Sequence, residues 1–416
     1  MANPLWRSGV ISIACTSVLA AVGCGGDDST GTPAPSTATA GSVAMPPSAA
    51  SAGSSATNSG TSTPVATTPP AGSSNPSTAG SAAPTSSAGA AAPSNDPGTP
   101  ATNKPPATMP TMPATPSMPP VDTNPTLFFL NNLGQVIRSA ADGSARTVIV
   151  ASAGSGPDGV AVDAKAGKVY WTNMGAPNGN DGTLMSAGLD GKNVATIVKS
   201  GGTFTPKQLK LDAANGKLYW SDREGMRVMR ANVDGSMIET LVQTGSTEAE
   251  RSDASHWCVG IAVDVAGGKL YWTQKGPDNG KVGTINRANL ELPAGADPAK
   301  RTDIEVLFKN LPEPIDLDLD LDKRLLYWTD RGDNTVSRAP LDPAAGFDPA
   351  ARKDREILVK GLSEAIGISL DVSRNRMFYT SLGGDVDVAN LDGSMSKTLL
   401  MDQGAVTGVV LAELPK

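Results

Sequence analysis

The chain has 416 residues, and its 34 lysine and arginine residues against 41 aspartate and glutamate residues give a formal net charge of −7. This acidic balance, without a basic patch or stripe, excludes nucleic acid as the expected partner. A single histidine and three cysteines leave few residues for covalent catalysis, which needs a nucleophile, a base and an orienting group.

Residues 1–23 have the features of an export signal. Arg7 supplies a positive start, and residues 8–23 are mostly apolar but too short for a comfortable membrane span. The small residues before Cys24 resemble the end of a bacterial lipoprotein signal, in which Cys24 would carry lipid and anchor the chain in a bilayer. The alternative is an ordinary secretory signal that ends near a cysteine. The resemblance implies a lipid-anchored, extracytoplasmic protein of the bacterial cell envelope, and Gly25 favours the outer membrane.

Residues 24–124 consist mainly of alanine, serine, threonine, proline and glycine. No aromatic residue lies between Trp6 and Phe128, so this segment cannot bury a core. The sequence predicts a disordered tether that lifts the following domain off the membrane. A spacer of unselected length is the alternative.

Five short segments in residues 125–416 repeat one pattern, an aromatic pair followed by threonine or serine. They recur roughly every 50 residues, a period that indicates a stacked or radial architecture. An aspartate precedes each first aromatic residue by seven positions. The segments are 168–172, 217–221, 269–273, 325–329 and 376–380, and the aspartates are Asp163, Asp212, Asp264, Asp320 and Asp371.

Each repeat is predicted to form four antiparallel strands. An apolar run such as 160–162 comes first, the aromatic pair lies on the second strand, and Asp-Gly pairs such as 190–191 mark the turn between the third and fourth. Adjacent aromatic residues on one strand point to opposite faces, so both are buried only if the sheet is covered on both sides. Four-stranded sheets packed radially in this way form a β-propeller.

The pattern resembles the YWTD repeat of the low-density lipoprotein receptor family, whose domain is a six-bladed β-propeller. The resemblance covers about residues 126–412 and implies an all-β fold of six four-stranded blades. The closing aspartate of the motif survives only as Asp222 and Asp330, and the first copy is degraded to residues 128–131. That first copy has no first strand before it. We therefore expect residues 405–412 to complete it and to close the ring, which removes exposed sheet edges.

Long loops after the second strands and between repeats are predicted to share one face of the propeller. Loops on a rigid scaffold are where binding residues usually lie. We expect Trp257 to be an aromatic anchor for a ligand, and the alternative is that it packs under its own loop. The other candidates around it are His256, Arg223, Lys275 and Asp278.

Two further groups of side chains have residue types that suit metal binding and catalysis. Asn178, Asn180 and Asp181 offer oxygen ligands that would suit calcium, but their loop lacks the spacing and the bidentate glutamate of an EF-hand. We expect no cofactor, with calcium at these residues as the alternative. Cys258 is expected to be a small buried thiol. A catalytic pair with His256 is the other interpretation.

The first strands place two residues of each repeat, two positions apart, along the central channel. Aligned on the repeated aspartate, most of these residues are small, which suits a crowded axis. The exceptions are Lys210, Asp316 and Asp318. An ion pair that bridges blades is one interpretation of these three residues, and a site for a polar ligand or ion is the other.

These features favour a non-catalytic binding or scaffold module whose long-loop face, on blades two to four, recognises an envelope or extracellular protein or a glycan. No catalytic residue is assigned. Two alternatives are a propeller enzyme, such as a metal-dependent hydrolase, lactonase or lyase, and a structural spacer of the envelope. Stoichiometric metal would favour the enzyme, and a partner that depends on Trp257 would favour binding.

Overall fold

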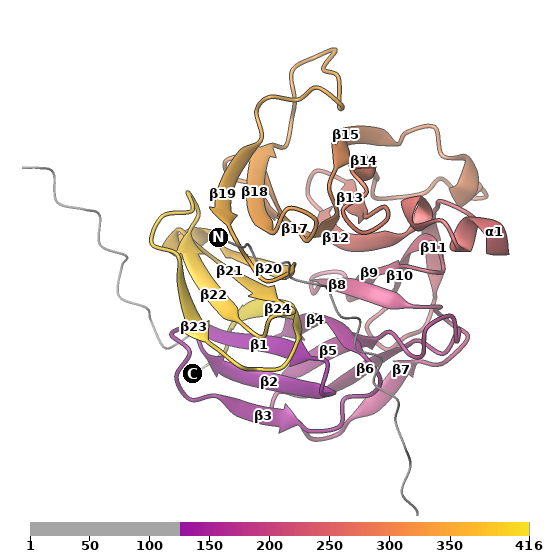
Figure 1. The fold of residues 1–416 in the computed structure, drawn as a ribbon. Coiled ribbons are helices and arrows are strands. Elements are labelled where there is room, and N and C mark those ends of the chain that lie inside the picture. Colours follow the sequence, from indigo (N-terminus) through magenta and orange to yellow (C-terminus); the bar gives the residue numbers. More distant parts are fainter. Residues whose placement is uncertain (1–124, 416) are drawn as a thin grey trace, which may run out of the picture. The chain divides into compact units, whose positions relative to one another are not determined.

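The computed structural model describes residues 125–415; the predicted signal 1–23, the tether 24–124 and Cys24 lie outside the described residues. Within residues 125–415, six four-stranded antiparallel sheets are arranged as blades around a common axis (Figure 1). The innermost strands β4, β8, β12, β16, β20 and β24 contact one another in this order, and β24 contacts β4. The blades therefore form a closed ring, which confirms the predicted six-bladed β-propeller.

The strands of each blade follow one another from the axis outward. Blade one contains β24 (Val406–Glu413), β1 (Pro125–Asn131), β2 (Gln135–Ala140) and β3 (Thr147–Val150), and blade two contains β4 (Pro157–Asp163), β5 (Lys168–Asn173), β6 (Thr183–Gly188) and β7 (Ala195–Val198). Blade three contains β8 (Pro206–Asp212), β9 (Lys217–Asp222), β10 (Arg227–Asn232) and β11 (Glu239–Gln243), and blade four contains β12 (Cys258–Asp264), β13 (Lys269–Gln274), β14 (Gly283–Asn289) and β15 (Glu305–Leu311). Blade five contains β16 (Pro314–Asp320), β17 (Leu325–Asp330), β18 (Thr335–Pro340) and β19 (Glu356–Lys360), and blade six contains β20 (Ala365–Asp371), β21 (Arg376–Ser381), β22 (Val386–Asn390) and β23 (Lys397–Leu400).

Short helical turns lie in the connections. They are α1 (Glu248–Arg251), η1 (Ala254–His256), η2 (Pro298–Lys300) and η3 (Val372–Arg374). Within residues 125–415, no helix has the length and apolar character needed to cross a membrane. In blade one, the last strand β24 pairs antiparallel with the first strand β1, so the two ends of the described chain meet in one sheet.

The paired aromatic residues pack into different interfaces, as their opposite directions require. Tyr271 of blade four is fully buried against Leu317 and Trp328 of blade five. Trp272, the next residue, is fully buried on the other side of the sheet against Tyr219 of blade three. Each Tyr-Trp pair thus contributes one large apolar side chain to each of its two neighbouring blades.

The hydroxyl that follows each aromatic pair joins its own blade to the next one. The Thr273 Oγ1 accepts from the backbone N–H of Gly260, at 2.7 Å, and donates to the backbone carbonyl of Ile315 in blade five, at 2.7 Å. Blade one has Leu130 at this position, and Thr407 of β24 supplies the bond to blade two instead, by donating to Pro157 O at 2.9 Å. The same double contact is made by Thr172, Thr329 and Thr380.

The repeated aspartate closes the turn between the first two strands of its blade. In blade four, Asp264 accepts from the backbone N–H of Gly267, three residues later, at 2.7 Å. This local bond fixes the short turn before the second strand, and so explains the constant spacing to the aromatic pair. The equivalent bonds are made by Asp163, Asp212, Asp320 and Asp371.

Two similar insertions separate the outer strands of blades four and five. Each contains the pattern Asp-Pro-Ala-x-Arg-x-Asp, at residues 297–303 and 348–354. Arg301 donates to Leu241 O of blade three at 3.0 Å, and Arg352 stacks on Phe308 of blade four, 4.0 Å from the ring centroid. Each insertion therefore contacts the preceding blade at the outer rim of the ring.

Candidate ligand-binding site at the mouth of the channel

Four of the predicted binding residues line one cavity on the long-loop face. Arg223 follows β9, Lys275 follows β13, Asp278 lies in the same loop as Lys275, and Trp257 comes directly before β12. The cavity has a volume of about 450 Å³ and lies where the innermost strands begin. We call it the channel-mouth pocket.

The pocket is built by equivalent positions of the repeat. One set of six residues comes directly after the second strand of each blade, and a second set consists of the second residue of each innermost strand. All twelve residues line the pocket: Asn132, Met174, Arg223, Lys275, Arg331 and Leu382 in the first set, and Asp158, Lys207, Val259, Ile315, Ile366 and Thr407 in the second. Ten of these twelve residues are not among the residues predicted from the sequence, although their equivalent positions in the repeat identify them.

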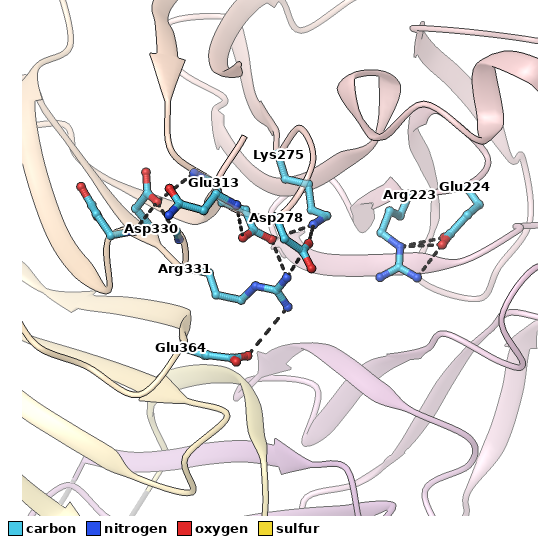
Figure 2. Close-up of polar contacts among 11 residues, drawn as sticks. Arg223, Glu224, Lys275, Asp278, Glu313, Asp330, Arg331 and Glu364 are labelled. Carbon is cyan, nitrogen blue, oxygen red and sulfur yellow. Dashed lines mark hydrogen bonds and ion pairs between the residues drawn. The ribbon is translucent and has the colours of Figure 1, made fainter. Parts of the chain in front are cut away.

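Carboxylates hold the basic residues of blades four and five in place. Figure 2 shows Lys275, Asp278, Glu313 and Arg331 in one group of contacts. Lys275 Nζ lies 2.6 Å from Glu313 and 2.8 Å from Asp278, and Arg331 lies 2.7 Å from both acids. Glu313 is only 2% exposed, whereas Asp278 is 79% exposed. Hydrogen bonding to Lys275 lowers the pKa of Asp278, so this exposed carboxylate stays ionised. A ligand could therefore replace Asp278 more easily than Glu313.

Trp257 is tied to its own loop and also lines the channel-mouth pocket. Its indole Nε1 donates to the backbone carbonyl of Arg251 at 2.8 Å, which ties it to its own loop. Its ring also lines the pocket, with the Arg223 Cζ 5.0 Å and the Lys275 Nζ 5.7 Å from the ring centroid. Arg223 in turn pairs with Glu224 at 2.5 Å (Figure 2). The ring is thus tied to its own loop and lies within cation–π distance of two basic side chains, with part of its surface open.

The floor of the pocket is apolar, with one charged pair beside it. Val259, Ile315 and Ile366 form a buried cluster from three innermost strands. Lys207 forms an ion pair with Asp158 of the neighbouring blade, and burial lowers the pKa of Lys207 despite this partner. An apolar floor below a ring of fixed charges suits a ligand that has an apolar group next to a polar one.

Two groups of candidates lie outside the lining of this pocket. His256 turns its ring toward Thr244, with Nδ1 2.5 Å from the backbone carbonyl. Asp181 accepts from Ala176 N at 2.8 Å, while Asn178 and Asn180 occupy positive-φ positions of the same turn. These contacts explain the loop residues as turn formers. Within residues 125–415, no group of three or more histidine, cysteine, aspartate or glutamate side chains is placed to hold a metal.

The channel residues meet inside the ring. A cavity of about 310 Å³ is lined by Lys210, Asp316 and Asp318, and Lys210 Nζ lies 3.6 Å from Asp318. Burial alone would lower the pKa of Lys210, but the two aspartates outweigh it and raise the pKa. Asp316 and Asp318 also accept from the backbone N–H groups of Ile368 and Leu370 in blade six. The ion pair across the channel is present, and the carboxylates link blades five and six.

Cys258 is fully buried in the interface between blades three and four. Burial raises the pKa of its thiol to about 12, so the thiolate that a nucleophile requires is not formed near neutral pH. The buried-thiol interpretation of this cysteine agrees with the structure.

The comparisons with known proteins define the family. A protein of Pyricularia oryzae named low-density lipoprotein receptor-related protein 1 is 41% identical over 290 residues, which covers 67% of this chain and 92% of the fungal protein. The chain belongs to this family of low-density lipoprotein receptor-related propellers. A human low-density lipoprotein receptor-related protein 5-like protein is 26% identical over 191 residues, covering 45% of this chain and 64% of the human protein. No protein-family model matches the chain.

A second fungal relative carries a different name. The 3-hydroxyacyl-CoA dehydrogenase-like protein LAM1 of Cochliobolus heterostrophus is 40% identical over 266 residues, which covers 62% of this chain but only 56% of that protein. Among solved structures, a chain of the nidogen/laminin complex matches with a TM-score of 0.54 and 21% identity, covering 69% of this chain and 98% of that chain. TolB of Acinetobacter baumannii matches with a TM-score of 0.51 and 13% identity, covering 71% and 68%. These two structures share the fold with this chain.

Proposed function

We propose that the propeller is a non-catalytic binding module that recognises a protein segment or a glycan through the channel-mouth pocket. The observation that carries this proposal is the arrangement of Trp257 between Arg223 and Lys275 above an apolar floor. Aromatic and arginine side chains held in place at a partly open pocket are typical of the residues that dominate binding energy at interfaces. The name of the nidogen/laminin complex agrees with a role in protein binding for a propeller of this fold.

The experiment is site-specific photo-crosslinking on intact cells. A photoreactive amino acid replaces Met174, which lines the pocket, and in a matched control it replaces Lys192, an 80% exposed residue of a hairpin turn outside the pocket. We expect a crosslinked partner from position 174 and not from position 192. The additional change Trp257→Ala should abolish that crosslink while the chain stays folded. Protease and glycosidase digestion of the product distinguish a protein from a glycan.

Two outcomes contradict this proposal. A crosslink that survives Trp257→Ala in a folded chain shows that the pocket does not select the partner. No crosslink at either position leaves the spacer role as the better explanation. The relative named dehydrogenase-like does not favour an enzyme here, because the match covers 56% of that protein and does not show which part carries the named activity.

The position of the propeller in the cell is a second proposal. We infer that acylation of Cys24 holds the chain outside the cytoplasm on the bacterial envelope, with the outer membrane favoured, and that residues 24–124 act as the tether. The support is the sequence pattern alone. Metabolic labelling with a fatty-acid analogue tests it: label should enter the wild-type chain and be absent from Cys24→Ser. Equal labelling of both chains would exclude Cys24 as the acylated residue.

A further inference from the structure

A second cavity lies at the rim of blade three, on the same face as the channel-mouth pocket. Its volume is about 380 Å³, and its polar lining comes from Asn180, Arg227, Gln243, Ser246 and Arg251. No acidic residue lines it, although the propeller as a whole is acidic. Asp222, which pairs with Arg227, is not part of this lining, whereas in the channel-mouth pocket and in the channel carboxylates belong to the lining itself. We call this second cavity the blade-three rim cavity.

Arg251 is the most informative residue of the rim cavity. Its guanidinium stacks on Phe204, with the Cζ 4.1 Å from the ring centroid. Within residues 125–415, Arg251 is the only arginine whose guanidinium donates to no oxygen, since each of the others has a carboxylate, amide, hydroxyl or carbonyl partner. The stack fixes the plane of the guanidinium and leaves its five N–H donors free for a ligand.

Asp222, the closing aspartate of the repeat motif in blade three, holds the rest of the cavity in place. Asp222 is fully buried and accepts from the backbone N–H of Phe204 at 3.0 Å. It also pairs with Arg227, at 2.5 Å. One carboxylate therefore positions both the aromatic platform under Arg251 and the second arginine of the cavity. In blade five, where the motif aspartate is Asp330, the residue equivalent to Arg227 is Thr335, so this pair of arginines is particular to blade three.

We propose that the blade-three rim cavity binds a carboxylate group of an acidic peptide. A fixed arginine fork matches the two oxygens of a carboxylate, and Arg251 supplies it, since the charge of Arg227 is already balanced by Asp222. Ser246 and Asn180 are exposed, so the cavity is open to a group carried by a larger ligand. Glu248 and Glu250 lie on the same loop and oppose a dense polyanion such as a sulfated glycan. An acidic peptide carries at most one carboxylate per side chain, so its charge density is lower and it fits this charge distribution better.

This proposal is independent of the channel-mouth proposal, because the two cavities share no lining residue. The probe is a fluorescein-labelled hexaglutamate peptide, measured by fluorescence anisotropy with the full chain in dilute buffer, and hexaglutamine is the neutral comparison. We expect the wild-type chain to bind hexaglutamate, with loss of binding as salt is raised. Arg251→Gln should weaken this binding by about tenfold or more, as expected for the loss of a hydrogen bond to a charged group.

Two variants control the measurement. Arg251→Lys keeps the charge without the fork and should bind between the wild type and Arg251→Gln. Lys192→Gln removes one exposed positive charge from a hairpin turn away from the cavity and should bind like the wild type. Because the Arg251 guanidinium donates no hydrogen bond within residues 125–415 and stacks only on Phe204, Arg251→Gln should fold normally, which circular dichroism and thermal unfolding check.

Several results would overturn the proposal. These are absence of hexaglutamate binding to the wild type, equal binding of hexaglutamine, and equal binding by the wild type and Arg251→Gln. A heparin competitor forms the last arm. If heparin binds more tightly than hexaglutamate and Arg251→Gln weakens both equally, the cavity is a site for sulfated glycans and the assignment to an acidic peptide is wrong.

Discussion

The indole Nε1 of Trp257 donates to the backbone carbonyl of Arg251 at 2.8 Å, and this bond joins two cavities through one loop. Trp257 lines the channel-mouth pocket, while the side chain of Arg251 lines the blade-three rim cavity. The loop between them is short and is fixed further by a capping box, in which Thr247 and Glu250 satisfy each other's backbone N–H groups. The loop therefore presents both side chains as one rigid unit.

Replacing Trp257 with phenylalanine tests this bond. Trp257→Phe keeps an aromatic ring in the pocket but leaves the Arg251 carbonyl without its donor. We expect the free energy of unfolding to fall by about 1 kcal/mol, the usual net contribution of a hydrogen bond. Proteolysis of residues 243–257 should become faster. Urea unfolding and limited digestion measure the two effects, and an unchanged digestion rate would show that the bond does not hold the loop.

The hydroxyl contact between blades gives a second prediction. Thr273→Val keeps the shape of the side chain but leaves the Gly260 N–H and the Ile315 carbonyl without the partner that now joins them. Because both groups are buried, we expect the free energy of unfolding to fall by about 2 kcal/mol or more. The matched control is Thr196→Val on β7, where the threonine is exposed and contacts only the Met185 sulfur. Equal effects of the two changes in urea unfolding would contradict this role of the hydroxyl.

The fold could be predicted because its determinants are local and repeated. The aspartate fixes a turn three residues away, as in Asp264 and Gly267, and the aromatic pair specifies a sheet that is covered on both faces. This spacing can be seen in the sequence, but the bridge that the threonine of the motif, such as Thr273, makes between two blades cannot. That role depends on contacts between residues about 40 positions apart, which the spacing inside one repeat does not reveal.

The candidate site was predictable only in part. Trp257, Arg223, Lys275 and Asp278 were found because they belong to long or charged loops. Glu313, which holds Lys275, comes from a short connection that has no unusual composition. The basic residues that contact Glu313 and the residues of the apolar floor lie at equivalent positions of different repeats. A comparison of these positions around the ring would therefore have found them. The rim cavity depends on the stacking of two side chains from separate loops, and no sequence pattern signals that contact.

Asp316 gives the channel a predicted pH dependence. Burial raises the pKa of Asp316 to about 7, although Lys210 opposes this shift. The folded chain then holds this proton more tightly than the unfolded chain, whose aspartate titrates near 3.8. Stability contributed by the protonated group is therefore lost as the pH rises through about 7. We expect Asp316→Asn to remove this loss, so that the stability of the wild type relative to the variant is greater at pH 5 than at pH 8.

Urea unfolding of both chains at the two pH values measures the difference. The control is Asp234→Asn in an exposed hairpin turn, where hydrogen bonding to Ser236 lowers the pKa of the carboxyl. That group stays ionised at both pH values, so its replacement should not change the dependence on pH. If Asp316→Asn retains the wild-type dependence, another group titrates in this range; Asp330, whose pKa burial also raises to about 7, would be the next to replace.

Replacing the buried arginine of each insertion should lower the stability of the chain, and the two losses should add. Arg352 is 2% exposed, donates to Pro340 O at 2.8 Å and stacks on Phe308, so Arg352→Met keeps the stacked chain and removes the donors. We expect the free energy of unfolding to fall by about 2 kcal/mol, since these bonds involve a charged donor. Lys353→Met, at the exposed neighbour, should change it by about 0.5 kcal/mol or less. Arg301→Met should behave like Arg352→Met.

The double variant decides whether the two insertions stabilise the ring independently. Arg301 contacts Asp303, Leu241 and Asn289, and the contacts of Arg352 include none of these residues. If the insertions act independently, the two losses in the free energy of unfolding should add within about 0.5 kcal/mol. Urea unfolding of the two single variants and the double variant measures the sum. If the free energy of unfolding of the double variant falls by much less than the sum, the two insertions stabilise one shared interface. They would then not stabilise two separate blade boundaries.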